Sequence, residues 1–155
     1  MTTLNAATVF ARKLRNTAPL LLLAAGTAAQ AATYTMYRDP SCGCCVEWAE
    51  HVREGMAAEV ITTDHPDMAS LKDELGVPEA LRSCHTMEVG GYVIEGHVPA
   101  ADIARLLEER PAGVRGLAVP GMPVGSPGME MGGRTQPYQV VAFGDGGMRV
   151  FASYP

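Results

Sequence analysis

Hydrophobic and polar residues in the first half of the chain follow the patterns of short strands and helices. Residues 33–38 (Thr-Tyr-Thr-Met-Tyr-Arg) alternate and are rich in β-forming side chains, and residues 59–63 form a second run of this kind. Between them, residues 46–54 carry an apolar stripe at helical spacing and are followed by Gly55. This pattern predicts two strands joined by an amphipathic helix.

A second, shorter helix is predicted after the polar residues 64–67. Pro66 suits the first turn of a helix, and Gly76 suits its end. The buried face of this helix is expected to consist of Met68, Leu71 and Leu75.

The next elements are a predicted hairpin and a predicted helix. Residues 86–89 and 92–95 are β-rich and flank Gly90-Gly91, a pair typical of a tight hairpin turn. Residues 99–109 then have helical spacing up to Pro111.

The remainder of the chain divides into an irregular segment and a final hairpin. Residues 112–137 are rich in proline and glycine, which predicts a loop without regular structure. Residues 138–143 and 148–154 predict two strands that could add to the edge of a sheet. The whole order is β-α-β-α-β-β-α, which is typical of a thioredoxin-like α/β single domain, with the Pro/Gly-rich loop and C-terminal β-hairpin as additions. Another small α+β sandwich is the alternative.

Residues 1–31 are predicted to be a cleaved secretory signal peptide. Arg12, Lys13 and Arg15 precede an apolar run over residues 18–29, and Ala29-Gln30-Ala31 fits the small-residue cleavage rule. The apolar run is shorter than the about 20 residues that a membrane-spanning helix needs. We therefore expect an exported protein without stable membrane insertion, with residues 32–155 as its single domain. A retained N-terminal anchor is the alternative.

The charge of the predicted mature domain is negative. Three of the chain's 12 Lys and Arg residues and none of its 17 Asp and Glu residues lie in the signal peptide, which leaves a formal charge of −8. No basic patch or alternation of basic and aromatic residues occurs, so nucleic acid and anionic membranes are not expected as partners. An acidic surface suits a protein that meets cations, although it is more often simply a soluble surface.

The four cysteines form the most specific pattern in the chain. Cys42, Cys44 and Cys45 lie at a predicted strand-to-helix junction, and Cys84 is followed directly by His85. Unpaired N–H groups and the helix dipole at such a junction favour thiolate. A polynuclear Cu(I) site would use all four thiolates, because thiolates bridge soft metal ions, and a four-cysteine zinc site is an alternative.

Disulfide formation and thiol-disulfide exchange are two further roles that the cysteine pattern allows. An even number of cysteines in an exported protein usually forms disulfides, but this cluster could staple distant segments only through a bond to Cys84. Cys42 and Cys45 also have the Cys-x-x-Cys spacing of a dithiol oxidoreductase, which needs just two of the four thiols.

Histidines supply further candidate ligands. His85 is the best of them because it adjoins Cys84. His51 lies two helical turns after Cys44, about 10 Å along the helix axis, and His97 follows the first hairpin. Both are candidates for groups that surround the metal site without binding the metal. His65 is expected to be structural or solvent-facing.

Two methionines in the Pro/Gly-rich loop are also candidate ligands. Met122 and Met129 carry soft thioether sulfurs, and rigid turns could hold these over a metal site. Packing of the same side chains into the core is the alternative.

Four motifs carry a resemblance to a known family. They are Tyr-Arg-Asp-Pro-Ser-Cys-Gly-Cys-Cys at residues 37–45, Ser-Cys-His-Thr at 83–86, Gly-Tyr-Val-Ile-Glu-Gly-His-Val-Pro at 91–99, and the Pro/Gly-rich stretch at 116–130. Together they resemble the CopG-type copper-resistance proteins, a family long described only as a domain of unknown function. The resemblance spans nearly the whole predicted mature chain.

This resemblance implies a periplasmic protein with a thioredoxin-like fold and a cysteine-bridged multinuclear copper cluster, often encoded beside copper-efflux systems. The cluster ligands it implies are Cys42, Cys44, Cys45 and Cys84, with His85 as the best histidine candidate.

We therefore predict a periplasmic copper-binding protein for copper resistance or homeostasis. It is expected to sequester Cu(I), with cycling to Cu(II) as a further expectation, and to meet copper ions and periplasmic efflux or carrier proteins. The main alternative is a thiol-disulfide oxidoreductase that uses Cys42 and Cys45, and a third is a zinc-binding or disulfide-stapled module that binds another protein. No catalytic triad, phosphate loop or catalytic carboxylate pair occurs, so the enzymatic activities that stay open are copper redox chemistry and the thiol-disulfide exchange of the alternative.

Overall fold

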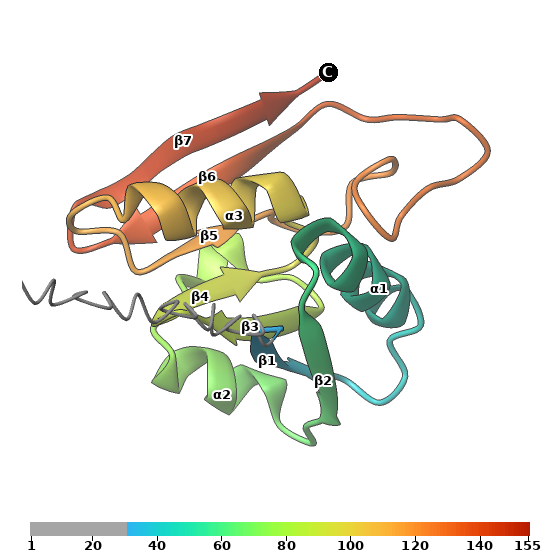
Figure 1. The fold of residues 1–155 in the computed structure, drawn as a ribbon, viewed down its shortest axis with the longest axis horizontal. Coiled ribbons are helices and arrows are strands. Elements are labelled where there is room, and N and C mark those ends of the chain that lie inside the picture. Colours follow the sequence, from blue (N-terminus) through green and yellow to red (C-terminus); the bar gives the residue numbers. More distant parts are fainter. Residues whose placement is uncertain (1–30) are drawn as a thin grey trace, which may run out of the picture.

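The computed structural model describes residues 31–155 as one mixed α/β domain built on a seven-stranded sheet (Figure 1). All but the last residue of the predicted signal peptide lies outside these residues. Within the part of the chain that is described, no helix is long and apolar enough to cross a membrane.

The elements alternate between strands and helices before ending in strands. In chain order they are β1 (Thr33–Arg38), α1 (Cys44–Met56), β2 (Glu59–Asp64), α2 (Met68–Glu74), a 3-10 turn (Glu79–Leu81), β3 (His85–Val89), β4 (Tyr92–Glu95), α3 (Ala100–Glu109), β5 (Gly116–Ala118), β6 (Tyr138–Gly144) and β7 (Gly147–Tyr154).

The sheet is mixed, with the order β2-β1-β3-β4-β5-β6-β7. β1 pairs in parallel with β2 and antiparallel with β3, and β3 pairs with β4 across the tight Gly90-Gly91 turn. β5 then runs parallel to β4, and the β6–β7 hairpin extends the far edge.

Alternate strand residues divide the core between the two faces of the sheet. The main core joins the sheet to α1 and α3 and includes Met36, Trp48, Val52, Met87, Ile94, Ile103, Leu106 and Leu117. A smaller cluster on the other face includes Val77, Leu81, Val93, Ala118 and Phe143 and lies on the side of α2 (Figure 1).

The predicted strands, helices and hairpins are confirmed to within a few residues, with two exceptions. β5 lies inside the segment predicted to be irregular, because its three residues gain their extended form from pairing with β4 and β6. The predicted buried face of α2 is wrong. Met68, Leu71 and Leu75 are only partly buried, whereas Lys72 is buried.

The predicted end of α1 near Gly55 is confirmed to within two residues. The helix continues to Met56 and ends where Ala57 adopts the left-handed conformation with φ 48°. Gly55 instead lets α1 approach α3, since a Cβ atom at this position would lie 2.6 Å from the Cβ of Ala100. Close contact of these two helices depends on the missing side chain.

Gly55→Val should therefore destabilise the protein by about 1–3 kcal/mol through overpacking against α3. The free energy of unfolding in urea measures this. Glu54→Val is the matched control, because the same residue enters the same helix at an exposed position, and it should cost less than about 1 kcal/mol. Equal losses for the two variants would contradict the packing role of Gly55.

Candidate metal site

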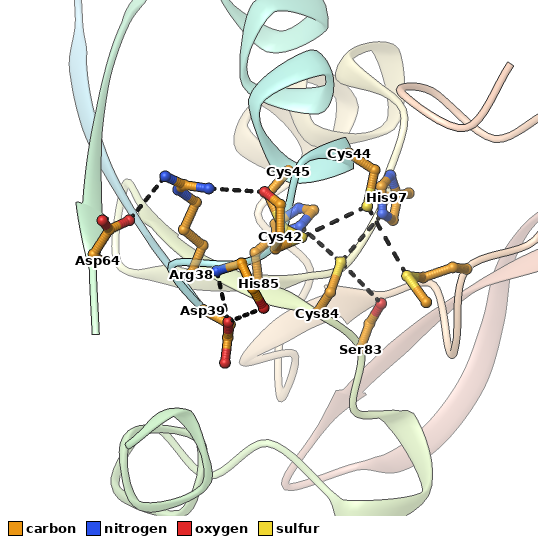
Figure 2. Close-up of a disulfide and its surroundings, with 12 residues drawn as sticks. Arg38, Asp39, Cys42, Cys44, Cys45, Asp64, Ser83, Cys84, His85 and His97 are labelled. Carbon is orange, nitrogen blue, oxygen red and sulfur yellow. Dashed lines mark hydrogen bonds and ion pairs between the residues drawn. A yellow bond between two sulfur atoms is a disulfide. The ribbon is translucent and has the colours of Figure 1, made fainter. Parts of the chain in front are cut away.

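The Cys42–Cys45 segment turns from the end of β1 into the first turn of α1. The N–H of Cys42 donates to the carbonyl oxygen of Asp39 at 3.0 Å, and Arg38 Nη1 donates to the carbonyl oxygen of Cys42 at 2.8 Å. An ion pair of 3.0 Å with Asp64 on β2 holds the Arg38 side chain in turn. Two strand ends therefore fix the backbone that carries the first thiols (Figure 2).

The four cysteine sulfurs converge on one place. The Sγ atoms of Cys42, Cys44, Cys45 and Cys84 all lie within 4.8 Å of one another. Cys42 and Cys45 form a disulfide, whereas Cys44 and Cys84 are free thiols. The Cys44 sulfur lies 3.6 Å from that of Cys42. The disulfide therefore lies within the Cys-x-x-Cys pair, and it does not join this segment to Cys84.

Two histidines meet Cys84 from the same hairpin. His85 Nδ1 and His97 Nε2 each lie 3.3 Å from Cys84 Sγ, and these three atoms form a second group of candidate metal ligands (Figure 2). The sequence predicted that His97 surrounds the metal site without binding the metal. In the structure it lies as close to the Cys84 sulfur as His85 does.

The hairpin register contains the signal that locates His97. Thr86 pairs with Glu95, and the N–H of Gly96 donates to the carbonyl oxygen of His85 at 3.0 Å. One further step of the same antiparallel register sets Cys84 opposite His97. A register extrapolated from the Gly90-Gly91 turn could therefore have found this pair.

The Pro/Gly-rich loop fixes the orientation of His97. The carbonyl oxygen of Pro127 lies 2.8 Å from His97 Nδ1, so Nδ1 carries the proton and donates it to this oxygen. The unprotonated Nε2 then faces Cys84. This arrangement, in which the outer ring nitrogen donates to a carbonyl, is the one usual for metal-binding histidines.

The loop can reach this position because residue 128 is glycine. Gly128 has φ +79°, and a Cβ atom there would lie 2.7 Å from the backbone nitrogen of Trp48 in α1. The loop between β5 and β6 therefore packs directly on the start of the helix that carries the cysteines (Figure 1).

His85 is held by burial and by an aromatic contact. It is fully buried, and its ring centre lies 4.3 Å from that of Trp48, whose Nε1 donates to the carbonyl oxygen of Val98. With Nδ1 directed at Cys84, His85 Nε2 has no hydrogen-bond partner.

Burial keeps the donors of this site uncharged in the absence of metal. It is the main cause that raises the pKa of Cys84 to about 12, with the neighbouring Cys44 as a smaller cause. Burial also lowers the pKa of His85 well below its ordinary value, with smaller electrostatic contributions from His97 and Lys72, and burial lowers the pKa of His97. The thiol of Cys84 therefore has to lose its proton when a metal binds.

The remaining predicted site residues take different places. His51 Nε2 accepts a hydrogen bond of 3.0 Å from the N–H of Ala100, so this ring caps α3. Met122 Sδ lies 4.0 Å from Cys44 Sγ, and the Met122 side chain is 51% exposed. Met129 is partly buried, and within residues 31–155 no hydrogen bond joins it to a cysteine. His65 lies away from the thiols, where its Nδ1 accepts from the N–H of Asp67.

The buried ion pair between Lys72 and Glu95 holds the segment before β3 in place. Glu95 Oε1 accepts from Lys72 Nζ and from the N–H of Ser83, both at 2.6 Å, and Glu95 Oε2 accepts from Thr86 Oγ1 at 2.6 Å. Lys72 Nζ also donates to Thr86 Oγ1 at 2.8 Å. Ser83 and Thr86 flank the Cys84-His85 pair, so this network sets the backbone of both candidate ligands. No local sequence pattern indicated this network.

The arrangement suits a small soft ion better than an organic substrate. Thiolate and thioether sulfurs prefer Cu(I), and imidazole also suits Cu(II) and Zn(II). A surface hollow of about 620 Å³ lies beside Tyr138 and Tyr154, but no cysteine or histidine lines it.

Comparison with known proteins gives one consistent result. Residues 81–129 match the family model described as "Protein of unknown function, DUF411". Two solved structures described as copper resistance protein CopG, forms 2 and 1, are 45% and 46% identical to this chain, with TM-scores of 0.75 and 0.72. Each comparison covers 81% of this chain, and 100% and 99% of the respective structures. No protein in the curated set matches the sequence.

Loss of one member of the buried ion pair should be far more damaging than loss of both charges. Lys72→Met leaves the Glu95 carboxylate buried and unpaired, and should lower the free energy of unfolding by about 3–5 kcal/mol. Lys72→Met combined with Glu95→Gln removes both charges and should recover a large part of this loss. Urea denaturation of both variants tests the pair, and equal destabilisation would contradict an energetic coupling between them.

Proposed function

Since this chain belongs to the family of CopG copper-resistance proteins, we propose that it sequesters Cu(I) in a cluster bridged by its cysteine thiolates. The observation that carries the proposal is the convergence of four cysteine sulfurs within 4.8 Å of one another. Thiolates are the ligands that Cu(I) prefers, and one thiolate can bridge two such ions.

The number and directions of the donors favour more than one copper ion. Cys45 is fully buried, whereas its neighbour Cys44 contacts the exposed Met122. Two thiols with such different surroundings can bind two different ions more easily than they can both bind the same ion. His85 and His97 add two nitrogens beside Cys84. Four cysteines, two histidines and Met122 exceed the four positions of one tetrahedral ion.

Loading of the cluster requires reduction of the Cys42–Cys45 disulfide. A dithiol reductant would supply two electrons and two protons, become a disulfide itself, and leave Cys42 and Cys45 as thiols. Each thiol that becomes a copper ligand then releases its proton.

We also propose that the bound copper can cycle between Cu(I) and Cu(II), with an external one-electron acceptor taking the electron and an external one-electron donor returning it. The sulfurs favour the cuprous ion, while the imidazoles of His85 and His97 suit both oxidation states. Neither ring needs to lose a proton to bind, because burial keeps both neutral.

The broader context of this function is likewise a proposal. The order β2-β1-β3-β4, with the cysteines at the start of the helix after β1, supports a thioredoxin-like unit over residues 33–109. The composition of residues 1–31 supports export to the periplasm. There the protein would receive copper from, or pass it to, efflux or carrier proteins, and the half-exposed Met122 beside Cys44 supports transfer at this point.

A thiol-disulfide oxidoreductase is the second candidate, and the disulfide between Cys42 and Cys45 favours it. Such an enzyme would use one of these sulfurs to attack a substrate disulfide and the other to resolve the mixed disulfide. This mechanism would not use the thiols of Cys44 and Cys84.

Anaerobic titration of the reduced chain with Cu(I), in competition with a chromogenic chelator, tests the main proposal. We expect more than one copper per chain, and a lower stoichiometry for Cys44→Ser because a bridging thiolate is lost. His65→Gln is the matched control, since His65 lies outside the site, and it should bind as the wild type does. A stoichiometry of one or less in the wild type, or no loss in Cys44→Ser, would contradict the cluster.

Reduction of insulin disulfides by metal-free protein separates the two candidates. We expect no catalytic turnover above the rate with reductant alone. An oxidoreductase would instead show turnover that survives the combined change Cys44→Ser and Cys84→Ser and disappears in Cys42→Ser.

A further inference from the structure

We propose that the oxidised chain, with its Cys42–Cys45 disulfide intact, has a separate mononuclear site for a divalent transition-metal ion, formed by Cys84, His85 and His97. This inference rests on the proposed role of the region in metal binding. It concerns a redox state in which the four-thiolate cluster cannot form, because two of its sulfurs are bonded to each other.

Both sulfur-to-nitrogen distances already suit a bound metal ion. A tetrahedral ion with a sulfur ligand at about 2.3 Å and nitrogen ligands at about 2.0–2.1 Å holds sulfur and nitrogen about 3.5 Å apart. Cys84 Sγ lies 3.3 Å from both His85 Nδ1 and His97 Nε2, and all three atoms lie within 4.8 Å of one another. Binding therefore keeps the sulfur-to-nitrogen spacing and requires the two nitrogens to take the separation that one ion imposes.

The hydrogen bonds around Cys84 are incomplete without a metal. A thiol has one proton, so Cys84 can donate to only one of the two imidazoles. The Pro127 carbonyl holds the His97 proton on Nδ1 and leaves the Nε2 lone pair facing the sulfur. His85 is fully buried and directs Nδ1 at the same sulfur from 3.3 Å. A cation bound to all three donors would use both lone pairs and the sulfur.

The surroundings keep the two histidines in place and leave the sulfur accessible. Trp48 and the Pro127–Gly128 segment confine the rings, which are fully buried. Cys84 itself is only partly buried, so a metal ion can enter from its side. Two nitrogens and one sulfur suit Cu(II), Zn(II) or Co(II), with a fourth position left for water or another ligand.

The binding step involves protons and no electrons. The divalent ion takes the lone pairs of the two neutral imidazoles and displaces the proton of the Cys84 thiol, which goes to solvent. Because the cluster of the reduced chain also uses Cys84, the two kinds of site exclude each other. The state of the Cys42–Cys45 pair would thus decide whether the chain takes several cuprous ions or one divalent ion.

Co²⁺ titration of oxidised Cys44→Ser protein without reductant tests the inference. In this background Cys84 is the single free thiol, which a thiol count verifies, and disulfide exchange with Cys44 cannot occur. We expect one Co²⁺ per chain, with a thiolate-to-cobalt charge-transfer band and the intense visible bands of a tetrahedral ion. A further change of Cys84→Ser should abolish the charge-transfer band.

Two histidine variants show whether the site is the one proposed. His97→Asn removes the Nε2 ligand but keeps an N–H that can donate to Pro127, and should weaken Co²⁺ binding by more than about 100-fold, beyond the cost of losing an outer hydrogen-bond partner. His65→Gln should change nothing. Far-UV circular dichroism checks that each variant is folded. Absence of Co²⁺ binding, binding without the charge-transfer band, or unchanged affinity in folded His97→Asn protein would overturn the inference.

The result is independent of the Cu(I) titration of the reduced chain. Co²⁺ binding to the oxidised protein together with one or no Cu(I) per reduced chain would leave this site standing and reject the cluster. The opposite pattern would reject this site alone.

Discussion

The register of the β3–β4 hairpin is the constraint on which the candidate metal site depends. Antiparallel pairing across the Gly90-Gly91 turn sets His97 opposite Cys84, and the same hairpin supplies His85. A shift of one residue in this pairing would turn the side chains of one strand to the other face of the sheet and move His97 away from Cys84. The buried carboxylate of Glu95 reinforces this register, because it accepts hydrogen bonds from both Ser83 and Thr86. The same strand pairing therefore positions both the polar network around Glu95 and the candidate metal ligands.

The cysteines of α1 reach the same place through a different set of contacts. β1 lies beside β3 in the sheet, so the turn that follows β1 starts next to the segment that carries Cys84. The Pro/Gly-rich loop covers both parts. Its Pro127 carbonyl holds His97, and Gly128 packs on the backbone of α1 at Trp48. This loop therefore has a structural role, because it contacts both the hairpin that carries the histidines and the helix that carries the first three cysteines.

Much of this organisation could be predicted from the sequence, where the signal was local. Alternation and helical spacing located most elements, and the cysteine spacing located the thiols. The elements that were missed depend on contacts between distant residues. β5 is three residues long and extended because two neighbours pair with it, and Lys72 is buried because Glu95 lies opposite it on another element. Gly55 looked like a helix end, but its role is set by Ala100, a residue 45 positions away. His97 is intermediate, because the turn that places it was predicted while the register was not extended to Cys84.

The protonation of these groups bears on which cations such a site selects. The helix start favours thiolate, but Cys84 lies before β3, and burial raises the pKa of its thiol to about 12. Burial keeps both histidines neutral. The buried carboxylate of Glu95 is engaged by Lys72 and two further donors, so it offers no negative charge to the site. Hard cations such as Ca²⁺ and Mg²⁺, which need oxygen ligands, find none among these donors. An ion can bind only if its bonds to sulfur and nitrogen are strong enough to displace the Cys84 proton. Selection then follows from the affinity of the metal for sulfur and nitrogen and not from negative charge held at the site, which favours copper over Ca²⁺ and Mg²⁺.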